Sequence, residues 1–86
     1  MSAEMIQATR LWSQALGELQ LQLTSTTYQQ WLRPTFVVAR QNGTLVVAAH
    51  NGFAKDWLEN RLKSTLKRVL AGIIHAAVEI EFVEVR

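Results

Sequence analysis

The 86-residue chain contains no cysteine, a single proline and only two histidines. Without cysteine it can form neither a disulfide framework nor a thiolate metal site, which is compatible with a reducing compartment. His50 and His75 are separated by a predicted helix, at no metal-ligand spacing and with no paired carboxylates beside them. The sequence therefore predicts no bound metal and no cofactor.

Long apolar runs are also absent. The longest is a handful of residues, which excludes a membrane-spanning helix. The first ten residues lack the basic segment and apolar stretch of a secretory signal, so we expect a cytoplasmic protein with no membrane partner. A hydrophobic fraction of 49% with 19% charged residues is typical of one folded globular domain.

The residues that carry catalysis are scarce. The hydroxyl run 24–27 has no histidine or acid in a motif relation to it, so helix capping explains it better than nucleophilic chemistry. Period-two alternation places Glu79 and Glu81 on a solvated sheet face, without the burial that tunes a carboxyl pKa. We expect a protein that is not an enzyme.

Periodicity and turn residues predict the element order. Helices are predicted at about 5–23, 26–33 and 52–72, and strands at about 35–40, 44–49 and 78–84. Asn42-Gly43 predicts a tight hairpin turn between the first two strands, and Asn51 is placed to cap the third helix. The fold class is thus α+β, a single domain of ααββαβ order with a three-stranded sheet packed by helices. The sequence does not determine the order of the strands in the sheet.

Three tryptophans dominate the candidate core. Trp12 lies within the apolar stripe of the first helix, beside Leu11 at its edge, and this spacing alone favours burial. Trp31 and Trp57 share helix faces with other apolar residues and are predicted to be core. Phe53, at the start of the third helix, fits either packing under the hairpin or an outward position.

Basic residues concentrate in one segment. Residues 55–68 hold five basic side chains against two acidic ones, whereas residues 69–86 hold three acidic side chains against one basic. The simpler interpretation is a solvated helix face, but such a segment also attracts phosphate weakly. Weak single-stranded nucleic-acid contacts are therefore predicted at Lys55, Arg61, Lys63 and Lys67.

Three blocks of sequence, taken with the element order, resemble a known family. They are Leu11-Trp12, Trp31-Leu32-Arg33-Pro34 and Asn51-x-Phe53-x-x-Asp56-Trp57. In this order they resemble the amino-terminal domain of the bacterial replication initiator DnaA, over nearly the whole chain. The resemblance implies a fold similar to K-homology domains, although the Gly-x-x-Gly loop of RNA-binding members is missing here.

The resemblance also implies a function. It predicts a protein–protein interaction domain in replication initiation, which associates weakly with itself and recruits the replicative helicase or regulatory proteins. The alternative is a K-homology-like module that binds single-stranded nucleic acid through the basic third helix. In the family, ATP hydrolysis and recognition of the duplex origin belong to other domains.

Specific residues follow from the resemblance. Self-association is assigned to Trp12 with Leu11, and this role favours an indole that is exposed in the isolated chain. The helicase and regulator surface is assigned to Phe53, Asn51 and Ala54, which favours partial exposure of Phe53. Thr27 belongs to the same surface, at a position where the family often has an acidic residue.

Overall fold

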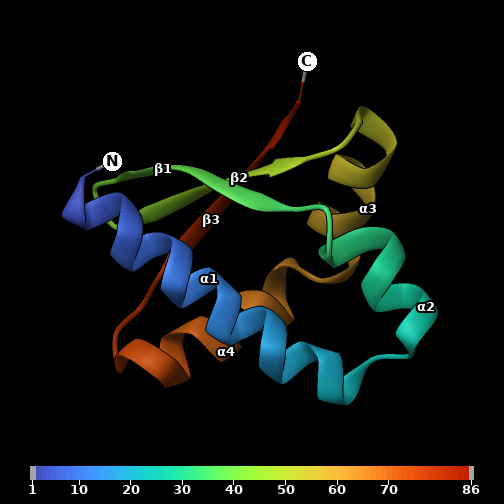
Figure 1. The fold of residues 1–86 in the computed structure, drawn as a ribbon, viewed down its shortest axis with the longest axis horizontal. Coiled ribbons are helices and arrows are strands. Elements are labelled where there is room, and N and C mark those ends of the chain that lie inside the picture. Colours follow the sequence, from blue (N-terminus) through green and yellow to red (C-terminus); the bar gives the residue numbers. More distant parts are fainter. Residues whose placement is uncertain (1, 86) are drawn as a thin grey trace.

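Helices and a three-stranded sheet alternate along the part of the chain, residues 2–85, that the computed structural model describes. The elements are α1 (Ala3–Gln22), α2 (Ser25–Thr27), the π-helical segment η1 (Tyr28–Leu32), β1 (Phe36–Gln41), β2 (Thr44–Ala49), α3 (Gly52–Arg61), α4 (Lys63–Ile74) and β3 (Glu79–Glu84). Figure 1 shows α1 and α4 on one side of the sheet and α3 beside one end of it. The predicted α+β class is confirmed.

Helix α1 forms from a clear amphipathic pattern. The side chain of Ser2 accepts a hydrogen bond from the amide of Met5 at 3.2 Å and caps the start of the helix. One face of the helix is buried, whereas Leu21 on the opposite side is 88% exposed. The buried residues are Ala8, Leu11, Trp12, Ala15, Leu16 and Leu19. No helix within residues 2–85 has the length and apolar character needed to cross a membrane.

The sheet has the order β1-β2-β3. Its hairpin turn is the predicted one, because Asn42 and Gly43 both adopt positive φ angles, 51° and 82°. Strands β1 and β2 are antiparallel, with a bulge between Val37 and Ala39. Strands β2 and β3 are parallel, so α3 and α4 together form the crossover between them.

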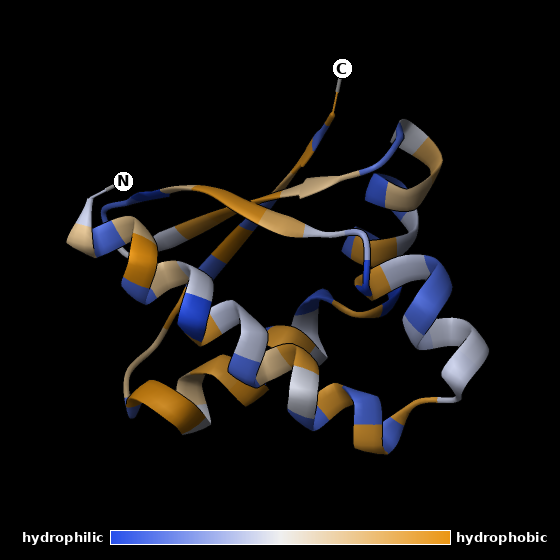
Figure 2. Cartoon of the chain, in the orientation of Figure 1, coloured by the Kyte–Doolittle hydropathy of each residue, from blue (hydrophilic) through white to orange (hydrophobic). Residues whose placement is uncertain are grey.

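One core lies between the helices and the inner sheet face. The largest fully buried side chains come from nearly every element: Phe82, Leu19, Leu32, Leu45, Leu58, Leu66, Leu70 and Val47. Figure 2 shows hydrophobic residues running along β1 and along α4. The final strand follows its predicted pattern, since Ile80 and Phe82 are buried while Glu79 and Glu81 are exposed.

The sequence predicts one continuous third helix, but in the structure this helix divides at Leu62 into α3 and α4. This residue has φ −120° and ψ −11°, outside helical values, and its side chain is buried. The bend lets α3 pack against β3 and β2 while α4 packs against α1. The leucine row through Leu58, Leu62 and Leu66 continues across the bend without a proline or glycine, so nothing local in the sequence predicts it. Helix α4 then runs to Ile74, two residues beyond the predicted end.

The second helical segment differs from its prediction in cap and geometry. Thr24 caps it, one residue earlier than the predicted start at 26 requires, by accepting a hydrogen bond from the amide of Thr27 at 3.2 Å. Its last turn is π-helical, because the amide of Arg33 bonds the carbonyl of Tyr28 at 3.0 Å.

Candidate functional site

Trp12 is buried, so its predicted exposure is wrong. Only 3% of the residue is accessible, and Leu11 is 7% accessible. The indole Nε1–H donates a hydrogen bond to Thr35 Oγ1 at 3.0 Å, and the hydroxyl of Thr35 donates in turn to the carbonyl of Leu32. The side chain that the resemblance assigns to self-association therefore offers no contact surface in the isolated chain.

The burial of Trp12 has a physical cause that the sequence partly contains. An indole is buried favourably only where its N–H finds an acceptor, and Thr35, itself 7% accessible, provides that acceptor just after η1. The amphipathic spacing of α1 indicates burial correctly. The sequence does not identify Thr35 as the acceptor, because this residue lies 23 positions from Trp12 and outside α1.

Three aromatic side chains that are at least partly exposed lie together elsewhere, in a group we call the aromatic surface cluster: Trp31, Phe53 and Trp57. The rings of Trp31 and Trp57 stack with centroids 4.4 Å apart and an interplanar angle of 8°. The ring of Phe53 lies 5.6 Å from that of Trp31, tilted by 35°. Trp31 and Trp57 are thus only partly buried rather than core, whereas Phe53 is 71% exposed. The predicted exposure of Phe53 is confirmed.

Two helices position this cluster. Trp31 comes from η1, whereas Phe53 and Trp57 stand four residues apart on α3, one helical turn from each other. Asn51 Oδ1 accepts a hydrogen bond from the amide of Ala54 at 2.7 Å, which caps α3 and fixes the direction in which Phe53 leaves the helix. Stacking of offset or parallel rings adds about 0.5–1.5 kcal/mol beyond area burial, so Trp31 and Trp57 also tie the two helices together.

The other residues assigned to the helicase and regulator surface differ in accessibility. Ala54 is completely buried, so its side chain cannot touch a partner. Asn51 is exposed but acts as a helix cap. Thr27 is half-buried, accepts a hydrogen bond from the Thr24 hydroxyl at 2.8 Å, and precedes Trp31 by four residues.

A shallow depression adjoins the aromatic surface cluster. Phe53 and Trp57 form its apolar part, and Asp56, Asn60 and Arg61 form its polar part. Asn60 donates a hydrogen bond to the carbonyl of Asp56 at 2.8 Å. A bulky apolar centre with a polar and charged border is the arrangement of a protein contact surface.

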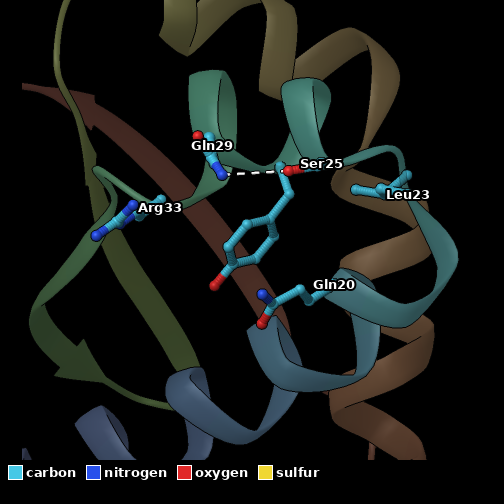
Figure 3. Close-up of a pocket in the computed structure, with 6 residues that line it drawn as sticks. Gln20, Leu23, Ser25, Gln29 and Arg33 are labelled. Carbon is cyan, nitrogen blue, oxygen red and sulfur yellow. Dashed lines mark hydrogen bonds between the residues drawn. The ribbon is translucent and has the colours of Figure 1, made fainter.

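A second hollow lies between the end of α1 and the α2–η1 segment (Figure 3). Its lining is mainly polar: Gln20, Leu23, Ser25, Tyr28, Gln29 and Arg33. The Gln29 amide donates to Ser25 Oγ at 3.1 Å across one side of it. No sequence signal predicted this hollow.

The four predicted nucleic-acid contacts do not form one free basic surface. Lys63 Nζ donates to Glu59 Oε2 at 3.1 Å, an i,i+4 ion pair across the bend. Lys67 Nζ lies 3.1 Å from both carboxylate oxygens of Glu79 on β3. Lys55 and Arg61 lie on α3, on the other side of the bend at Leu62. Within residues 2–85, no group of three His, Cys, Asp or Glu side chains is placed to hold a metal ion.

The fold and the surface define a small α+β domain with one mixed sheet and an exposed aromatic cluster at a helix start. The model of the DnaA N-terminal domain family matches residues 9–72, and the chain belongs to this family.

Similar proteins carry the same description. The chain is 33% identical over 75 residues to the chromosomal replication initiator protein DnaA of Roseiflexus castenholzii, covering 87% of this chain. It is 36% identical to the protein of that name from a Nostoc species and 34% identical to that of Trichormus variabilis, each over 70 residues and 81% of this chain. The matched region spans only 16% of the first relative and 15% of the other two.

Proposed function

We propose that this domain serves replication initiation in the cytoplasm as a non-catalytic contact module, which recruits the replicative helicase or a regulatory protein through the aromatic surface cluster. Family membership supports the setting in initiation. Self-association is the second part of the proposal, and its surface must be one other than Trp12.

The exposure of Phe53 is the observation that carries the recruitment proposal. A phenylalanine that is 71% exposed at the first turn of a capped helix contributes little to the core. Its ring lies beside two stacked indoles, which are costly to rearrange and so hold the surface in one shape. Rigid aromatic side chains near the centre of a contact surface dominate binding energies between proteins.

The test is the substitution Phe53→Ala. We expect it to weaken binding of the replicative helicase encoded by the same genome, or of a regulatory protein, by about tenfold or more, because a central aromatic anchor contributes about 2 kcal/mol or more. The free energy of unfolding should change by less than about 0.5 kcal/mol, since the ring is mostly solvated. Titration calorimetry and urea denaturation measure the two quantities.

Leu21→Ala is the matched control. Leu21 is also an exposed apolar residue, but it lies on α1 and outside the aromatic surface cluster. Its replacement should leave both binding and stability unchanged. Equal binding by the parent, Phe53→Ala and Leu21→Ala would exclude the aromatic surface cluster as the contact.

A further inference from the structure

One face of the sheet carries apolar side chains that no helix of residues 2–85 covers. Figure 1 shows α1 and α4 on the other side of the sheet and α3 beside one end. Val37, Val47 and Phe82, which stand in register across the three strands, belong to the core on the helix side. Because successive side chains of a strand point to opposite faces, their neighbours project outward. We call this the outer sheet face, and its apolar residues are Phe36, Val38, Val46, Ala48, Val83 and Val85.

The outer sheet face is unusually apolar for a solvated surface. Phe36 is 50% exposed, and Val38 and Val85 are each 42% exposed. Ala48 on the central strand has Phe36 and Val83 as its partners in register, so apolar side chains continue from β1 across to β3. The solvated face of a sheet is ordinarily polar, whereas contiguous exposed apolar patches mark contact sites.

The charged side chains of the outer sheet face are all acidic. Glu79 and Glu81 occupy successive outward positions on β3, and both are exposed. Arg40 is the only basic residue of the three strands, but it stands in register with the core residue Leu45 and so lies on the helix side. Glu79 is paired with Lys67 of α4, whereas Glu81 has no ion pair within the described residues.

The apolar and acidic side chains occupy different ends of this face. Val83 stands level with Ala48 and Phe36, whereas Glu81 stands level with Val46, one outward position nearer the hairpin turn. Successive outward positions on a strand are about 7 Å apart. The face therefore presents an apolar end beside α3 and a carboxylate one short step away from it.

We propose that the outer sheet face binds an amphipathic helix of another protein, whose apolar stripe packs on Phe36 and Val83 and whose lysine or arginine lies over Glu81. A helix suits this sheet, because α1 already packs against β1 from the opposite face. Residues four apart on a helix are separated by about 6 Å along its axis, close to the step from Val83 to Glu81. The bound helix thus needs a basic residue about one turn beyond its last apolar contact.

Charge complementarity distinguishes this occupant from others. Exposed carboxylates repel nucleic acid and anionic membranes, since both present negatively charged phosphates. A second copy seated face to face would bring no basic side chain of its own outer sheet face to Glu81. The proposed contact goes beyond the one at Phe53, because it gives the domain a second docking face with a different chemistry.

Two synthetic peptides test the proposal. One is an amphipathic helix of about 18 residues with leucines along one face and lysines beside them, and the other has glutamates in place of the lysines. We expect the parent chain to bind the lysine peptide about fivefold more tightly in fluorescence anisotropy titrations. The net charge of the chain, +2, favours the glutamate peptide instead, so this preference reports the local carboxylates. Amide chemical shifts should change most along the three strands.

Substitutions locate the contact. Glu81→Lys should reverse the preference, because it replaces an attraction to the lysine peptide with a repulsion. Phe36→Ser should weaken binding of both peptides, since it removes an apolar contact that they share. Glu18→Lys is the matched control: Glu18 is an exposed carboxylate on α1, so this variant has the same net charge as Glu81→Lys and should keep the preference of the parent. Circular dichroism and urea denaturation establish that the variants are folded.

Other results would overturn the proposal in distinguishable ways. Equal affinities of the two peptides for the parent, or no binding of either, would exclude a basic amphipathic occupant. A change of preference in Glu18→Lys as large as that in Glu81→Lys would reduce the effect to net charge. Loss of lysine-peptide binding in Phe53→Ala, with shifts confined to α3, would assign the peptide to the aromatic surface cluster. Shifts on the outer sheet face that grow with protein concentration and without peptide would assign this face to a second copy.

Discussion

At the scale of single residues, Thr35 determines how Trp12 is held. The Thr35 hydroxyl accepts from the indole and donates to the carbonyl of Leu32, so one side chain satisfies two buried polar groups. Among the described residues, no buried side-chain nitrogen or oxygen lacks a hydrogen-bond partner. Any change at Thr35 that removes the oxygen disturbs this arrangement.

Thr35→Val is therefore expected to lower the free energy of unfolding by about 1–3 kcal/mol, because it leaves the indole N–H buried without an acceptor. Thr35→Ser keeps the oxygen and should cost clearly less. Urea denaturation of the three proteins measures the difference. Equal stability of the valine and serine variants would mean that the indole finds another acceptor.

The three tryptophans show how far the sequence alone predicts whether a side chain is buried or exposed. The spacing of Trp12 along α1 indicates its burial, and the resemblance to a family whose Trp at this position is assigned to self-association pointed the other way. Trp31 and Trp57 lie on apolar helix faces and were therefore predicted to be core, but they are only partly buried, at the edge of the core, where their rings stack on each other. Contacts between side chains from distant segments determine exposure, and periodicity within one helix does not contain them.

At the scale of elements, the start of α3 joins stability to the proposed contact surface. Asn51 belongs to the surface that the resemblance assigns to partners, yet its side chain satisfies the backbone amide of Ala54. A substitution at Asn51 can therefore reduce partner binding by loosening the first turn, which carries Phe53, without removing any direct contact.

Asn51→Ala should lower the free energy of unfolding by about 1 kcal/mol, because the cap is lost. Asn51→Asp retains a capping oxygen and should preserve stability. If partner binding follows stability across the two variants, Asn51 acts through the helix; if Asn51→Asp is stable but does not bind, the amide itself contacts the partner. Thermal denaturation and calorimetry supply the two measurements.

The sequence predicted correctly those features that depend only on residues close together in the chain. The positive φ angles at Asn42-Gly43, the Asn51 cap and the alternation of β3 all depend on neighbouring residues, and all three are confirmed. The bend at Leu62 was not predicted, because it depends on how α3 packs against β3 and β2 while α4 packs against α1. The π-helical turn before Pro34 has no local sequence signal either.

At the scale of the whole molecule, charge distribution separates the proposed function from nucleic-acid binding. Two of the four predicted phosphate contacts, Lys63 and Lys67, are already paired with carboxylates. A single-stranded nucleic acid whose phosphates bind Lys63 and Lys67 would have to displace the carboxylates of Glu59 and Glu79.

We therefore expect weak binding of single-stranded oligonucleotides, with a slope of log affinity against log salt of magnitude about 1.4, because only two of the four predicted contacts, Lys55 and Arg61, are free to release counterions. A fluorescence titration at several salt concentrations measures the slope. A magnitude of about four or more, together with tight binding, would favour the single-strand-binding module over the protein contact module.

The parallel pairing of β2 with β3 has a consequence for biosynthesis. Ile80 and Phe82, both buried, belong to β3, which pairs with residues made more than thirty positions earlier. Until that strand leaves the ribosome, the nascent chain exposes Leu45 and Val47 with no partner on one side. The domain therefore acquires its core late, close to the moment when its last residues emerge.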